Sequence, residues 1–291
     1  MSFTRSNVPY RLVVTDIDGT FLDDDGNLPE SNRLALDHCR DLGVRTCLAT
    51  GRRWTTCNRL LDRLALRESV DFCILNNGMI LHEVATGKTL YRREFPHALV
   101  LQAVERLNTL SIDPIVLGHN ADGLTPDVFH RRDCLRNGDF VAKNPGHCLG
   151  LDAFEELRDR HLVELILIGS RPELEQAAAA LAGLPVETAI LRNSYYADHM
   201  LEVTPLGLSK LHGVRELLAH LGLTMDQTMA VGDSENDYQM LAAVPRSIAV
   251  SNADARIKAI AREITGSNSE GGFGQAVFRH LGNPLGSKAP A

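Results

Sequence analysis

The stretch RLVVTDIDGT (residues 11–20) joins a short apolar run to two aspartates that are separated by one residue. Such a run, followed by Gly-Thr, predicts a buried strand over residues 12–15. Side chains alternate along a strand, so Asp16 and Asp18 are expected on the same side of it. Two adjacent carboxylates repel each other unless a cation lies between them. The pair therefore favours a metal-assisted site, with an ordinary Asp-Gly turn as the alternative.

A second apolar run, over residues 44–49, ends at Thr50-Gly51-Arg52. A hydroxyl at the end of a strand, followed by glycine, offers an oxygen and backbone N–H groups to a phosphate. A plain junction between a strand and a helix explains the same residues. Lys210 is expected where a loop becomes a helix, an unusual place for a cation because the helix dipole is positive there.

A third predicted strand, over residues 228–231, leads into GDSEND (residues 232–237). Asp233 is expected at the end of this strand and Asp237 in the first turn of the helix that follows. Acidic residues also cap helices, which is the structural alternative. However, two carboxylates with the amide of Asn236 form an all-oxygen set that suits Mg²⁺.

Strands and helices alternate over residues 12–75, which predicts an α/β fold with a parallel sheet. A short hairpin or flap over residues 21–29 and a helix capped by Ser31 are expected after the first strand. Alternation is lost between about residues 83 and 193, where runs of strands and helices surround a polar segment at 118–150. We expect residues 83–193 to form an inserted α+β domain, with residues 1–82 and 194–291 forming a discontinuous core.

The chain has 291 residues, which favours two domains over one. A formal net charge of -7 argues against a nucleic-acid-binding surface, which would need a basic stripe. No run approaches 18 apolar residues, so no membrane span is expected. The six cysteines show no Cys-x-x-Cys spacing, and residues 1–9 show no signal peptide. These features predict a cytoplasmic protein with reduced thiols.

The four separated motifs together resemble those of the haloacid dehalogenase superfamily of phosphohydrolases. They are DIDGT (residues 16–20), Thr50-Gly51-Arg52, Lys210 and GDSEND (residues 232–237). The long insertion, and the Asn252-Ala253 and Gly271-Gly272 pairs near the end, are similar to the Cof-type branch. The resemblance implies a Rossmann-like, doubly wound parallel sheet as the core and a cap as the insertion.

The resemblance also implies a role for each motif. Asp16 would be the nucleophile and Asp18 the general acid and base. Thr50 and Lys210, with Gly51 beside them, would hold the phosphoryl group, and Asn236 would orient the substrate or a ligand. Mg²⁺ would be held by a set of acidic residues: Asp16, the backbone carbonyl of Asp18, Asp233 and Asp237.

We therefore expect a Mg²⁺-dependent phosphatase that hydrolyses a small phosphomonoester, such as a sugar phosphate or a related metabolite, through an aspartyl-phosphate. A sugar phosphomutase with the same aspartyl chemistry is the alternative, followed by a ligand-binding relative without catalysis. The cap would select the substrate, and its candidate residues are Arg131, Arg132, Lys143, His119 and His147. No preference for an oligomeric state follows from the sequence.

Overall fold

The computed structural model describes residues 8–110, 112–120, 126–134, 137–192 and 199–283. Contacts between residues divide the chain into two compact units. The first comprises Met1–Arg52, Thr56–Arg92 and Ser209–Ala291, and the second comprises Arg53–Thr55 and Arg93–Leu208. The predicted core–cap junction at residues 193–194 lies outside the described residues.

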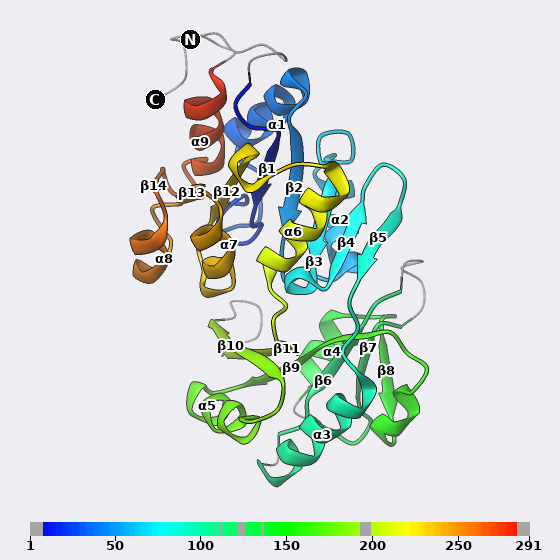
Figure 1. Cartoon of the computed structure of the whole chain (residues 1–291). Helices are drawn as coiled ribbons and strands as arrows, with labels where there is room; N and C mark the ends of the chain where they lie inside the picture. The colour runs from blue at the N-terminus through cyan, green and yellow to red at the C-terminus, as the bar shows by residue number, and fades with distance from the viewer. Residues whose placement is uncertain (1–7, 111, 121–125, 135–136, 193–198, 284–291) are drawn as a thin grey trace. The chain divides into compact units, whose positions relative to one another are not determined.

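In the described part of the first unit, eight strands form one sheet (Figure 1). In spatial order they are β14 (Glu263–Ile264), β13 (Arg246–Ala249), β12 (Thr228–Gly232), β1 (Leu12–Thr15), β2 (Arg45–Ala49), β3 (Phe72–Leu75), β4 (Ile80–Glu83) and β5 (Lys88–Arg92). The pairs from β14 to β3 are parallel, whereas β4 and β5 add an antiparallel hairpin at one edge.

The order of the strands reverses direction at β1. From β1 the chain moves through β2 to β3 on one side, and from β12 through β13 to β14 on the other. Right-handed crossovers then place α1 (Glu30–Leu42) and α2 (Trp54–Arg63) on one face of the sheet, with α7 (Tyr238–Ala243) and α8 (Ala255–Ile260) on the other. The fold is therefore a doubly wound, Rossmann-like sheet, in which the crevice beside β1 is the expected ligand site.

Two further helices complete the first unit. Helix α6 (Lys210–Leu221) contacts β3, β4 and α7, and α9 (Gly272–Leu281) packs along α1. Gly43 ends α1 with a φ of 70° and donates its N–H to two carbonyls of the last turn. This left-handed C-cap is the arrangement that glycine favours, because it lacks a Cβ.

The second unit has a six-stranded sheet within the described residues. Its order is β10 (Val186–Arg192), β11 (His199–Pro205), β9 (Leu162–Gly169), β6 (Ile115–Gly118), β7 (Val128–Arg131) and β8 (Cys148–Leu151), with only β7 and β8 pairing in parallel. Helices α3 (His97–Leu107) and α5 (Arg171–Ala180) bury a hydrophobic cluster that includes Val100, Leu165 and Leu201. Alternate residues of β9 and β11 enter this cluster, as expected for a sheet covered on one face.

Some predicted elements differ from those observed. Helix α1 starts at Glu30, and Pro29 occupies the N-cap position, so Ser31 is not the N-cap. The ring of proline fixes the backbone φ angle at a value that suits the start of a helix. The polar segment at 118–150 contains β7, α4 (Gly138–Lys143) and β8, and β10 and β14 were not predicted. Short strands and helices with a polar face leave too weak a periodicity to detect.

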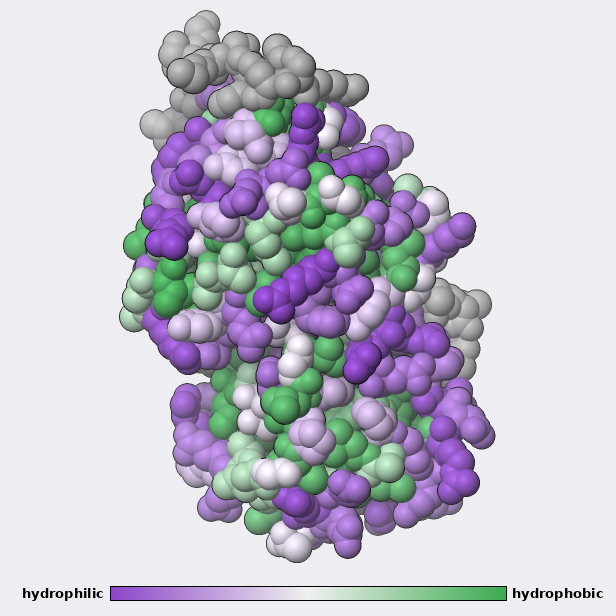
Figure 2. All heavy atoms as spheres, in the orientation of Figure 1, coloured by the Kyte–Doolittle hydropathy of each residue, from purple (hydrophilic) through white to green (hydrophobic). Residues whose placement is uncertain are grey.

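No helix among the described residues is both long enough and apolar enough to cross a membrane. Hydrophilic and hydrophobic residues are interspersed over the face shown in Figure 2. In the described ranges, the most exposed large hydrophobic side chains are Leu206 at 62% and Ile264 at 48%.

Gly78 allows α6 to approach the end of β3 closely. It adopts a φ of 101°, and a Cβ at this position would lie 2.0 Å from the carbonyl oxygen of Ser209. Ser209 directly precedes Lys210, the first residue of α6. The position of Lys210 therefore depends on a glycine at residue 78.

We predict that Gly78→Ala lowers the free energy of unfolding by about 2–4 kcal/mol, because it adds a backbone clash to the strain of a positive φ. Gly87→Ala is the matched control, since Gly87 has a φ of 68° with nothing within 4 Å. The control should lose only about 1 kcal/mol. Urea unfolding measures both, and equal losses would show that the close approach of α6 does not matter.

We also predict a pH dependence that arises from His82, which is completely buried in β4. Burial lowers the pKa of His82 from 6.5 to about 4, so the folded protein binds fewer protons than the unfolded chain between these values. Its contribution to stability is therefore complete above pH 6.5 and is lost as the pH falls towards 4. The slope should be at most about 1.4 kcal/mol per pH unit. His82→Gln should flatten the unfolding free energy over this window, and an unchanged slope would contradict the assignment.

Candidate active site

Asp16 and Asp18 follow the carboxyl end of β1 but lie in different environments. Asp16 is 4% exposed, whereas the side chain of Asp18 is 51% exposed. The guanidinium of Arg52 binds both oxygens of Asp18, with Nε donating to Oδ2 at 2.8 Å and Nη2 donating to Oδ1 at 2.5 Å. The motif thus separates into one buried carboxylate and one that faces solvent and is held by an arginine.

Lys210 connects the two halves of the core at this site. Its side chain is completely buried at the start of α6. The ammonium donates to Asp16 Oδ1 at 2.5 Å, to Asp237 Oδ1 at 2.8 Å and to Asn236 Oδ1 at 3.0 Å. A buried ammonium requires such partners, because an unpaired charge loses its hydration without compensation. Three predicted site residues therefore meet around the ammonium of a fourth, Lys210.

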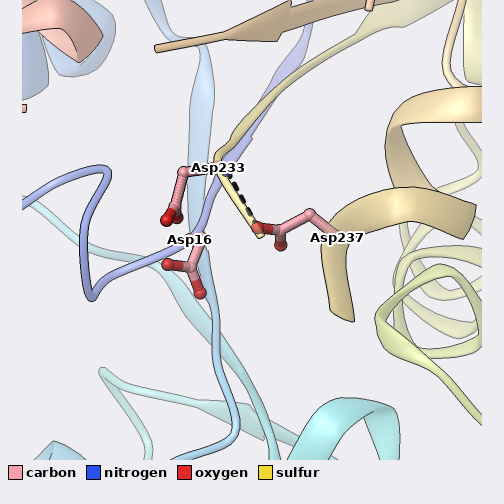
Figure 3. Close-up of side chains that lie close together, drawn as sticks. All are labelled: Asp16, Asp233 and Asp237. Atoms are coloured by element: carbon pink, nitrogen blue, oxygen red, sulfur yellow. Dashed lines mark hydrogen bonds between the residues drawn. The ribbon is translucent and has the colours of Figure 1, made fainter. Parts of the chain in front are cut away.

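Asp233 and Asp237 come from the turn that follows β12, the neighbour of β1. Asp237 Oδ2 accepts the backbone N–H groups of Asp233 and Ser234 at 3.0 and 3.1 Å, and the first of these bonds is drawn in Figure 3. Asp233 Oδ1 accepts the hydroxyl of Thr20 at 2.7 Å. Asp237 therefore closes its own turn, and Asp233 is tied to the loop that follows β1.

Burial and mutual repulsion change the protonation of this cluster. Burial raises the pKa of Asp16 well above its ordinary value, Lys210 opposes this shift, and Asp237 adds to it. Burial and the charge of Asp237 raise the pKa of Asp233 to about 7. Burial alone would lower the pKa of Lys210, but the carboxylates of Asp16 and Asp237 outweigh it and hold that pKa above its ordinary value.

The donor set fits a hard divalent cation. Oxygens of Asp16, Asp233 and Asp237 all lie within 4.8 Å of one another, the only such group of possible metal ligands within the described residues. Figure 3 shows the carboxylates of Asp16 and Asp233 side by side, with that of Asp237 turned towards the backbone of Asp233. Burial, with repulsion from Asp237, raises the pKa of Asp16 and of Asp233, and an all-carboxylate set is of the kind that Mg²⁺ binds. The Asp18 side chain is held by Arg52 instead, so its predicted metal contact remains that of its backbone carbonyl.

Thr50 and Gly51 follow β2, the other neighbour of β1. Thr50 is 1% exposed, and its hydroxyl oxygen accepts the backbone N–H of Arg52 at 3.1 Å. Because β1 and β2 are adjacent and parallel, this turn and Asp16 both lie at the carboxyl ends of the strands. Its role in binding a phosphoryl group stays a prediction.

Three residues of the site were not assigned from the sequence. Arg52 holds Asp18, Thr20 holds Asp233, and Asn77 Oδ1 accepts the amide of Asn236 at 3.2 Å. Arg52 and Thr20 belong to two of the motifs identified in the sequence, and this membership was the only indication that they lie at the site. Asn77 has a φ of 52°, which a sequence pattern does not reveal.

The five candidate selectivity residues of the predicted cap all lie in the second unit: Arg131, Arg132, Lys143, His119 and His147. Arg131 and Arg132 pair with nearby acids, Asp133 at 3.5 Å and Asp152 at 3.1 Å. His119 and His147 are buried. Their part in substrate selection stays a prediction.

Comparison with known proteins identifies the family of this chain. The family model of the haloacid dehalogenase-like hydrolases matches residues 13–277. A 5-amino-6-(5-phospho-D-ribitylamino)uracil phosphatase of Bacillus subtilis is 28% identical over 284 residues, covering 96% of this chain and 99% of the relative. An HMP-PP phosphatase of Klebsiella pneumoniae is 27% identical over 259 residues, covering 86% and 87%.

Solved structures show the same fold. A haloacid dehalogenase-like hydrolase from Bacteroides thetaiotaomicron has a TM-score of 0.74 at 23% identity, covering 93% of this chain and 99% of that one. The protein SMU.1108c from Streptococcus mutans has a TM-score of 0.78 at 19% identity, covering 94% and 100%. Because the family model matches residues 13–277, the chain belongs to the haloacid dehalogenase-like hydrolases, an enzyme family, and the two curated relatives above are phosphatases.

Proposed function

We propose that this protein is a Mg²⁺-dependent phosphatase that hydrolyses a small phosphomonoester through an aspartyl-phosphate. The observation that carries the proposal is the buried contact of Lys210 with Asp16 and Asp237 at the switch point of the sheet. It joins a nucleophilic carboxylate, a cation and the acidic turn after β12 in one place. Such a cluster costs stability unless it binds something, which is typical of an active site.

In the first step, a carboxylate oxygen of Asp16 attacks phosphorus, and the bond from phosphorus to the leaving oxygen breaks. Asp18 gives its proton to that oxygen, so the product leaves as an alcohol. Asp18 is suited to this role because its side chain is half exposed, where a substrate can reach it. Arg52 orients the carboxyl group through its hydrogen bonds to the Asp18 oxygens.

In the second step, Asp18 takes a proton from water, and the resulting hydroxide attacks the aspartyl-phosphate. The bond between phosphorus and the Asp16 oxygen breaks, which releases inorganic phosphate and restores the carboxylate. One group thus works as acid and then as base. Lys210 favours the charged form of Asp16 before attack and holds the carboxylate in place, because its ammonium lies 2.5 Å from Oδ1.

We assign the phosphoryl oxygens to Thr50, the backbone of Gly51, Lys210 and Asn236. Bound Mg²⁺, held by Asp16, the Asp18 carbonyl and Asp233, would offset the negative charge that builds up in the transition state. Both oxygens of Asp237 already accept hydrogen bonds, which supports an indirect part for Asp237, through water and by shaping the turn.

The relatives suggest the class of substrate. The names of two curated relatives describe phosphatases of small phosphorylated metabolites, one a ribitylaminouracil phosphate and one HMP-PP. We infer a small, soluble phosphomonoester such as a sugar phosphate for this chain, selected by the second unit acting as a cap. All six cysteines are free thiols, which supports a cytoplasmic location.

We predict that Asp16→Asn abolishes phosphate release, with a loss of at least about 10³-fold in kcat, because the amide is a poor nucleophile. A panel of phosphorylated metabolites, assayed for inorganic phosphate, measures this loss. Asp62→Asn is the control, since Asp62 is an exposed partner of Arg67 and should keep full activity. Turnover by Asp16→Asn would refute the assignment, and a bisphosphate-dependent exchange with little free phosphate would indicate a mutase.

We predict that removal of divalent cations with EDTA stops phosphate release and that added Mg²⁺ restores it. Asp233→Asn should raise the Mg²⁺ concentration for half-maximal activity about 10- to 100-fold. Asp226→Asn provides the control, because Asp226 is exposed in the 3₁₀ turn at Met225–Gln227, which precedes β12 and lies at its other end. Full activity in EDTA would exclude the metal.

A further inference from the structure

The loop after β1 is bound by side chains from distant parts of the first unit. Three of its backbone carbonyls, those of Gly19, Phe21 and Leu22, each accept a hydrogen bond from an asparagine amide. The donors are Asn252 at 2.8 Å, Asn32 at 2.8 Å and Asn268 at 3.0 Å, respectively. We call these three asparagines the amide clamp.

Each asparagine also accepts or donates a second bond that anchors it. Asn32 Oδ1 accepts the N–H of Gly274 at 2.7 Å, and Asn252 Oδ1 accepts the N–H of Asn268 at 2.9 Å. The amide of Asn268 donates to Asp24 at 2.9 Å as well. An asparagine side chain can do this because it carries both donors and an acceptor. The clamp therefore ties the loop to α1, to the turn after β13 and to the start of α9.

Burial indicates that the clamp is part of the rigid core. Asn32 and Asn268 are 0% and 2% exposed. Buried amides are costly unless they are hydrogen-bonded, and both have partners. Asn252 is exposed and binds the carbonyl next to Asp18, so it can be changed with little effect on packing.

Asp18 needs such support more than Asp16 does. Asp16 is held by burial and by Lys210, whereas the side chain of Asp18 is half exposed and bound by Arg52. Proton transfer to a leaving oxygen requires the donor within hydrogen-bond reach, and an error of about 1 Å can cost about 100-fold in rate. Asn252 fixes the peptide between Gly19 and Thr20, which begins one residue after Asp18.

We propose that Asn32, Asn252 and Asn268 are positioning residues that hold the loop from Asp18 to Leu22, and with it the proton donor, in its working geometry. The proposal rests on the function proposed above. The proposal assigns a role to Asn252 of the Asn252-Ala253 pair. It also assigns one to Asn268, which lies in the glycine- and serine-rich segment at 266–274.

The test compares two esters that differ in their need for a proton. The leaving group of 4-nitrophenyl phosphate departs without protonation, whereas that of phenyl phosphate benefits from it. Asn252→Ala should lower kcat/KM for phenyl phosphate about tenfold or more and for 4-nitrophenyl phosphate about threefold or less. Asn252→Asp keeps the acceptor for Asn268 but loses the donor to Gly19, so it should behave in the same way.

Thr46→Val is the matched control. It removes a hydrogen bond of 2.7 Å from a buried side chain to the carbonyl of Ser69, at the other end of β2. A purely structural loss should affect both esters equally, as we expect for this control. Equal losses on the two esters in the Asn252 variants, or wild-type values in Asn252→Asp, would overturn the proposal.

Hydrogen exchange separates this proposal from the proposed function. If the wild-type protein releases no phosphate from either ester, the proposed function fails, and the clamp is then judged by amide exchange over residues 17–24. Asn252→Ala should exchange faster there than wild type, and Thr46→Val should not. Unchanged exchange in Asn252→Ala would refute the clamp by itself.

Discussion

The buried ion cluster of Lys210 with Asp16 and Asp237 is the interaction on which the rest of this structure depends. Three carboxylates within one small volume repel each other, and burial strengthens the repulsion by excluding water. One buried ammonium offsets part of that cost, while burial and the charge of Asp237 still raise the pKa of Asp233 to about 7. This remaining cost is the physical basis for the divalent cation proposed above.

The fold provides this cluster through its topology. The strand order reverses beside β1, so the ends of β12, β1 and β2 lie next to one another although they are distant in sequence. Gly78 then allows α6 to begin close to β3, which brings Lys210 into contact with Asp16 and Asp237. A loop residue, Thr20, completes the arrangement by joining the turn of Asp233 to the loop after β1.

The two aspartates of the first motif have different surroundings, which is the basis of the separate roles proposed for them. Asp16 is buried and paired with Lys210, which suits a nucleophile whose approach must be controlled. Asp18 faces solvent and is held by Arg52, and the amide clamp binds the carbonyl of Gly19, the residue after it. The second unit is a separate sheet with its own hydrophobic cluster.

The sequence alone determined the α/β class, the parallel strands before Asp16, Thr50 and Asp233, and the list of chemical groups, because each motif is local and follows a strand with a clear apolar run. It did not predict β7, β8 and β10, whose short, mixed segments carry little periodicity. Nor did it assign Arg52, Thr20 or the amide clamp, because these act through contacts between residues as far as 246 positions apart. Only the tertiary structure decided that Lys210 lies between Asp16 and Asp237, since a buried salt bridge depends on which strand ends become neighbours in the sheet.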